Sequence, residues 1–102
     1  MPLTSKQRAQ LRALAATEDT ILTVGKEDVT ENVIRQAQDA LRARELIKGK
    51  VLDNSMLSAR GAAETLAEAT KSEVVQVIGS KFVLYKRNEK EPKIELVKVK
   101  KA

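Results

Sequence analysis

Apolar and polar residues along this chain alternate with two different periods, and the changes of period divide it into seven segments. Three stretches carry apolar residues at helical spacing and begin with Ser or Thr, which predicts helices over residues 4–16, 30–44 and 58–70. Four shorter stretches are rich in β-branched residues, which predicts strands over residues 20–24 and 45–52 and in the two arms of 73–87. The predicted order is therefore α-β-α-β-α-β-β.

Helices that alternate with strands favour an α/β fold. We expect one compact domain over residues 1–87, with a mixed sheet of about four strands packed with three helices. Gly79 and Ser80 join the last two strands as a two-residue hairpin turn. The helix 58–70 is rich in Ala, which predicts close packing against the sheet. Residues 88–102 form a basic tail, either loose or added as an edge strand.

Composition excludes several kinds of chemistry. The chain has no Cys and no His, so it lacks disulfides, thiol nucleophiles, imidazole acid–base groups and the usual zinc ligands. No phosphate-binding or dinucleotide glycine pattern occurs, and no apolar run is long enough to span a membrane. We therefore expect no enzymatic activity, no cofactor, no metal, no small-molecule substrate and no membrane partner. A chain without Cys and without an apolar leader fits the cytoplasm, and a monomer is the default.

The net charge is +5 at pH 7, and its distribution is more informative than its total. Residues 86–102 hold seven bases and three acids, a net of +4, so the rest of the chain is close to neutral. If the domain itself binds a polyanion, its bases must gather on one face.

Three groups of bases are candidates. The first helix begins in an acid-free stretch with Lys6, Arg8 and Arg12, which form either a phosphate-contacting ridge or an ordinary solvated face. The strand 45–52 places Lys48 and Lys50 on the face opposite Ile47 and Val51, where they either extend a basic surface or protect an exposed strand.

The third candidate is the loop at Gly25 and Lys26. A glycine turn that leads into a helix N-terminus presents free N–H groups and a positive dipole end, which suit phosphate. From spacing alone, a simple turn is the more common explanation. Aromatic residues are too few for a base-stacking platform. Phe82 and Tyr85 fall on opposite faces of the last strand, so one of them is expected in the core.

Several short motifs occur together in a fixed order. They are Leu3-Thr4-Ser5-Lys6-Gln7-Arg8, Val24-Gly25-Lys26 with Thr30-Glu31 and Val33, Glu45-Leu46-Ile47-Lys48, Gln76-Val77-Ile78-Gly79 and Val83-Leu84-Tyr85. In this combination the chain resembles the CRM domain family, small bacterial RNA-binding proteins of the YhbY type. The resemblance implies a mixed α/β sheet similar to the C-terminal domain of translation initiation factor three. It also implies binding to ribosomal RNA in precursors of the large subunit.

Family members carry a Gly-x-x-Gly loop, which is similar to the loop by which KH domains clamp an RNA backbone. Here Asp28 replaces the closing glycine, and Glu27 adds negative charge beside it. Gly49 stands where a β-branched residue is usual, and Thr20 where the family often has Pro. A glycine inside a strand costs roughly 1 kcal/mol unless a group must approach closely there.

The leading hypothesis is a non-enzymatic RNA-binding protein of large-subunit assembly, in which seven residues contact RNA. They are Gly25, Lys26, Arg8, Arg12, Lys6, Lys48 and Lys50. The alternative is a protein-interaction module of the same fold with weakened or lost RNA binding, suggested by Asp28 and the near-neutral domain. A third hypothesis is that the basic tail supplies the electrostatic attraction for RNA.

Overall fold

The computed structural model describes residues 3–25, 29–52, 58–87 and Ile94. Its elements are α1 (Ser5–Ala15), β1 (Thr20–Val24), α2 (Glu31–Arg44), β2 (Leu46–Val51), α3 (Ala59–Thr70), β3 (Glu73–Ile78) and β4 (Lys81–Tyr85). The predicted order and the predicted α/β class are confirmed. Lys26, Glu27, Asp28 and the tail apart from Ile94 lie outside the described residues.

Each helix begins at the hydroxyl residue that the sequence predicted. The Thr30 side chain accepts a hydrogen bond from the Val33 N–H at 3.2 Å, and the Ser58 hydroxyl accepts one from Gly61 at 3.0 Å. Thr4 does the same for α1 and forms a reciprocal capping box with Gln7. These contacts satisfy N–H groups that have no partner within a helix, so each start is determined within four residues.

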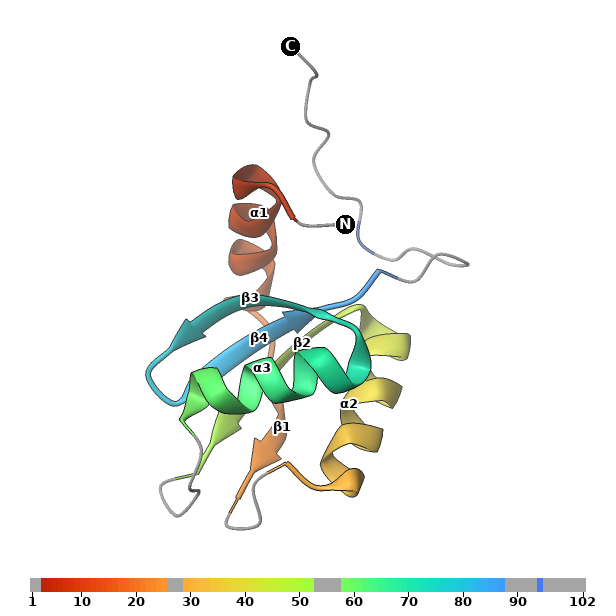
Figure 1. Ribbon diagram of the computed structural model, residues 1–102. Helices are drawn as coiled ribbons and strands as arrows, with labels where there is room; N and C mark the ends of the chain where they lie inside the picture. The colour runs from red at the N-terminus through yellow and green to blue at the C-terminus, as the bar shows by residue number, and fades with distance from the viewer. Residues whose placement is uncertain (1–2, 26–28, 53–57, 88–93, 95–102) are drawn as a thin grey trace.

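The four strands form one mixed sheet in the order β1-β2-β4-β3. β1 runs parallel to β2, whereas β4 is antiparallel to both β2 and β3. Figure 1 shows α3 lying across one face of the sheet and α1 on its far side, near one end of the strands. β1 and β3 are the two edges, and β3 carries an irregularity between Val74 and Gln76.

The period-2 alternation of the strands divides the core between the two faces. Ile47, Phe82 and Leu84 join the buried cluster under α2 and α3, whereas Val83 and Tyr85 join the cluster under α1. The alanines of α3 allow that helix to approach the sheet closely, as predicted; Ala59, Ala62 and Ala63 are all buried. Both aromatic side chains are therefore core residues, so neither is available to stack on a base.

Gly49 has a packing role that the sequence did not reveal. It lies opposite Phe82 across the β2–β4 pair, and the Phe82 ring covers it. A Cβ added at Gly49 would lie 2.5 Å from Phe82 Cζ, far inside the normal contact distance. The glycine therefore makes room for the Phe82 ring, the largest of the fully buried side chains among the described residues.

The junction between α2 and β2 is built around Glu45, which was expected to begin the strand. Glu45 instead ends α2 with a positive φ of 64°, and its side chain is fully buried. Its carboxylate Oε1 accepts a hydrogen bond from the Ile94 N–H at 2.7 Å, and its carbonyl accepts one from Lys86 at 2.9 Å. One acidic residue thus connects the end of α2 with the chain beyond β4.

Candidate nucleic-acid interface

Helix α1 covers only part of its face of the sheet. Leu11 and Ala15 are buried against Leu46, Val83 and Tyr85 at one end of β2 and β4. Farther along β2, the side chains on the same face are those of Lys48 and Lys50. The uncovered half of this face is therefore cationic, and the lysines belong to the same alternation that builds the core.

The strand register brings two lysines together on this uncovered half. Lys50 of β2 pairs with Lys81 at the start of β4, and Thr23 of β1 lies on the other side of Lys50. Both lysines are exposed, and neither has an acidic partner among the described residues. Like charges directly opposite one another on a sheet oppose folding, and an anion bound between them removes the repulsion.

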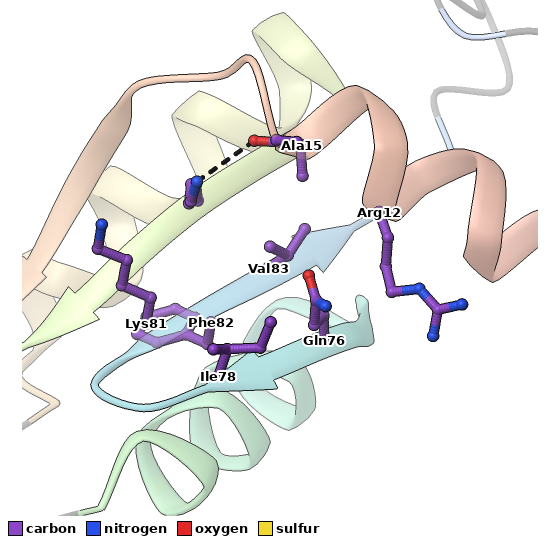
Figure 2. A pocket seen from close by; sticks show the side chains of 9 residues that line it. Arg12, Ala15, Gln76, Ile78, Lys81, Phe82 and Val83 are labelled. Carbon is purple, nitrogen blue, oxygen red and sulfur yellow. Dashed lines mark hydrogen bonds between the residues drawn. The ribbon is translucent and has the colours of Figure 1, made fainter.

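Lys48 lies between these lysines and the end of α1. Its Nζ donates a hydrogen bond of 3.4 Å to the carbonyl of Ala15, the last residue of the helix (Figure 2). A cation is favourable at the negative end of a helix dipole. Lys48 therefore has a structural partner, and it also lines the open space beside α1.

The three bases of α1 have different surroundings. Arg12 is exposed and reaches from α1 toward β3 on the same side of the sheet as Lys48 (Figure 2). The Arg8 guanidinium donates to the Val74 carbonyl and lies 3.9 Å from the Glu73 carboxylate, so it holds α1 against β3. Lys6 is exposed.

Gly25 directly follows Val24, the last residue of β1, and Val24 pairs with Val51 at the end of β2. The two strands run parallel, and the Leu52 N–H donates to the Val24 carbonyl at 2.8 Å. The Gly25 loop and Lys50 are consequently at the same end of the sheet. A Cβ at Gly25 would meet only Leu52 at 3.6 Å, an ordinary contact, so packing of the described residues does not require glycine there.

The structure adds three residues to the predicted set. Lys81, Gln76 and Ile78 line a cleft of about 360 Å³ between α1 and the β3–β4 hairpin, together with Arg12 and Lys48 (Figure 2). The sequence shows that Lys81 brackets a strand, but the β2–β4 register that places it beside Lys50 is not a local property. In the sequence, Gln76 and Ile78 belong to the hairpin motif Gln76-Val77-Ile78-Gly79, but nothing in that motif marks either residue as part of a binding site.

Other site types find no support in the described parts of the chain. Residues 3–25, 29–52, 58–87 and Ile94 contain no group of three acidic residues able to hold a metal ion. Among the same residues, no helix combines the length and apolarity needed to cross a membrane.

Comparison with known families agrees with this geometry. Residues 3–86 match the family model of the CRS1 / YhbY (CRM) domain. The chain belongs to the CRM family. The match spans every described element, from the residue before the α1 cap to the first residue after β4.

Curated relatives of this CRM chain carry RNA-binding names. The chain is 44% identical over 94 residues to the "Probable RNA-binding protein YqeI" of Bacillus subtilis (strain 168), covering 92% of this chain and 98% of that protein. It is 34% identical over 94 residues to an "RNA-binding protein" of Haemophilus influenzae, covering 92% of this chain and 94% of the relative.

A solved structure confirms the fold. The solution structure of a hypothetical protein from Staphylococcus aureus, described there as a candidate RNA-binding protein, superposes with a TM-score of 0.79. The two chains are 48% identical, and the superposition covers 94% of this chain and 100% of the other. The two chains therefore share the same fold.

Proposed function

We propose that this CRM protein binds RNA through the half of the sheet that α1 leaves uncovered. We call this the basic sheet surface, and it consists of Arg12, Lys48, Lys50 and Lys81. The observation that carries the proposal is the cross-strand pair of Lys50 with Lys81, exposed and without acidic partners among the described residues. The RNA-binding names of the relatives support the same conclusion.

The binding mechanism is mainly electrostatic. The spacing of the strands sets where the lysine ammonium groups lie. Each ammonium group that contacts a phosphate releases a counterion from the RNA. Both aromatic side chains are buried, so base stacking on exposed rings contributes nothing from the described surface. Phosphate contacts therefore supply most of the affinity and make it depend steeply on salt.

The Gly25 loop extends the basic sheet surface at one end. Lys26 follows Gly25 directly, and Gly25 lies at the same end of the sheet as Lys50. We propose that Gly25 and Lys26 contact the RNA backbone beyond the lysine pair. Lys6 provides a further cation at the start of α1. Arg8, which the sequence offered as a further RNA contact, is engaged with β3, so we assign it to holding α1 against the sheet.

We further propose that the natural RNA is ribosomal RNA in precursors of the large subunit, bound in the cytoplasm by a monomer without enzymatic activity. Residues 1–87 would form the RNA-binding domain, with 88–102 as a basic extension. The support is the family membership together with a sequence that contains neither His nor Cys. Salt-sensitive co-sedimentation with particles just lighter than the mature large subunit is the expected result on a sucrose gradient.

The decisive test compares two double variants that lose the same charge. Lys50→Gln/Lys81→Gln removes the cross-strand pair, whereas Arg35→Gln/Lys71→Gln removes two exposed cations from α2 and the end of α3, the helices on the other face of the sheet. Binding of a structured RNA hairpin is measured by fluorescence anisotropy over a range of salt concentrations. Two lost phosphate contacts should lower the salt slope by about 1.4–1.8 and the affinity at ~0.1 M salt by about 25- to 60-fold.

The control variant should lower the affinity and the salt slope much less than Lys50→Gln/Lys81→Gln does. It loses the same net charge but no proposed phosphate contact. Equal effects of the two double variants would show that the whole domain attracts RNA without a defined surface. Unchanged binding by Lys50→Gln/Lys81→Gln would assign the affinity to the tail or the loop. A parent protein that binds no RNA but captures a protein independently of salt would establish the alternative role as a protein-interaction module.

A further inference from the structure

The cleft between α1 and the β3–β4 hairpin differs chemically from the lysine pair beside it. Its floor is apolar and includes Ile78 and Val83, whereas Arg12, Lys48 and Lys81 lie around its rim. No acidic residue occurs among the described residues that line it. A surface built only to hold phosphates has no need of an apolar floor, because phosphates remain hydrated and bind charged groups and N–H donors.

Ile78 is unusual for a strand residue in this fold. It is 62% exposed, more than any other large apolar side chain of the described residues. It ends β3 directly before the Gly79 turn, and it pairs with Lys81 across the hairpin. An apolar side chain thus lies open to solvent next to a cation, which is the combination that the face of a base and its attached phosphate require.

Gln76 adds hydrogen-bonding capacity within the same cleft. Its side chain is half-buried and has no hydrogen-bond partner among the described residues. An amide presents both a donor and an acceptor, the pair of groups that can contact the edge of a base. In Figure 2 the Gln76 amide lies on the same side of the sheet as Val83 and beside the Arg12 side chain.

We infer that this cleft receives a single unpaired nucleotide of the bound RNA. The base lies against Ile78 and Val83, its edge contacts the Gln76 amide, and its phosphates lie at Arg12, Lys48 and Lys81. The volume of about 360 Å³ is near the lower limit of the ~300–1,000 Å³ typical of pockets for small ligands. It therefore suits one nucleotide rather than a duplex, whose bases are stacked and paired within the helix.

A second hollow provides a path for the flanking strand. It continues from the cleft along the free edge of β3, shares Arg12, Gln76 and Ile78 with it, and adds Arg8 and Arg60. Its lining is mainly polar, as a phosphate backbone requires. An RNA strand can therefore place one base in the cleft and continue past Arg12 toward Arg60.

This inference rests on the proposed RNA binding and specifies which RNA is bound. The test uses the full chain and three RNAs of otherwise identical sequence: a blunt duplex, the duplex with one bulged nucleotide, and the duplex with an abasic residue at the bulge. The abasic RNA has the same backbone and the same charge as the bulged RNA, so the difference between them reports the contribution of the base. Binding is followed by fluorescence anisotropy at constant salt concentration.

The parent protein should bind the bulged RNA about tenfold more tightly than the abasic RNA, which corresponds to ~1.4 kcal/mol. Gln76→Ala/Ile78→Ala should bind both equally, with its salt slope unchanged, because no charge is lost. Circular dichroism should show that this variant folds, since neither side chain is part of the buried core. Lys50→Gln/Lys81→Gln should weaken all three RNAs and retain the preference for the bulged RNA over the abasic RNA.

Equal affinity of the parent for bulged and abasic RNA would overturn the inference and leave the proposed RNA binding intact. A preference that survives in Gln76→Ala/Ile78→Ala would place the base elsewhere and would also overturn it. Binding of none of the three RNAs would overturn the proposed function itself.

Discussion

Replacement of Gly49 by alanine tests whether the Phe82 ring determines the residue at the centre of β2. The added Cβ would lie 2.5 Å from Cζ and 2.7 Å from Cε2 of the ring. Ordinary carbon contacts are ~3.5–4.0 Å, so the ring must move by roughly 1 Å. Phe82 is 1% exposed and belongs to a cluster of buried core residues, so a displaced ring presses against other core side chains.

The expected change is a balance of two opposing effects. Overpacking of a buried site costs about 1–3 kcal/mol, and the cost should be in the upper part of this range because an aromatic ring is rigid. Alanine in a strand recovers about 0.5–1 kcal/mol relative to glycine. We therefore expect Gly49→Ala to lower the free energy of unfolding by about 1–2 kcal/mol, which urea denaturation followed by circular dichroism measures directly.

Gly25→Ala is the matched control, because its Cβ would meet only Leu52 Cδ1 at 3.6 Å. It should leave the free energy of unfolding unchanged or raise it by up to ~1 kcal/mol. In a Phe82→Leu background the penalty of Gly49→Ala should largely disappear, giving a coupling energy of about 1 kcal/mol or more. The reasoning is refuted if Gly49→Ala is as stable as Gly25→Ala, or if its penalty is the same with and without the ring.

Two further predictions concern single side chains. Arg8→Ala should lower the free energy of unfolding by about 1–2 kcal/mol, because the Val74 carbonyl loses a charged donor, and leave the salt slope of RNA binding unchanged; a reduced slope with unaltered stability would instead make Arg8 a phosphate ligand. Burial, and then the Glu45 charge, raise the pKa of Tyr85 above the ordinary 10.0. Tyr85 is the only tyrosine, so phenolate absorbance should have a higher midpoint in the folded protein than in urea. Because the pKa of Tyr85 is higher in the folded state than in the unfolded state, the protonated phenol favours folding. This contribution to the free energy of unfolding is complete below pH ~10 and is lost as the pH rises through the folded-state pKa. Equal midpoints would contradict the burial of the phenol.

The seven elements could be predicted because each depends on a few neighbouring residues, although the start of β2 was predicted one residue early, at Glu45. A hydroxyl at Thr30 or Ser58 satisfies N–H groups three residues away, and Gly79 adopts the positive φ of 57° that its turn requires. The placement of Lys48 and Lys50 on one face of β2 follows from the period of a strand. The same local information placed Arg12 on the exposed face of α1.

The assembled surface depended on contacts between distant segments. The pairing of Lys50 with Lys81 needs the strand order β1-β2-β4-β3, which no stretch of the sequence specifies by itself. The sequence identified Arg8 as a candidate for phosphate, but only its position beside Val74 shows that it holds α1 against the sheet. Gln76 entered the site only through packing of the hairpin against α1.

The sequence by itself thus determined the elements, the faces of their side chains and the family, because hydrogen bonding within a turn and the period of a strand act over a few residues. The tertiary structure decided which faces meet, why Gly49 is a glycine, and that α1 leaves half of a sheet face uncovered. These depend on the shapes of side chains far apart in the chain, since a buried ring such as Phe82 excludes every other atom from its volume.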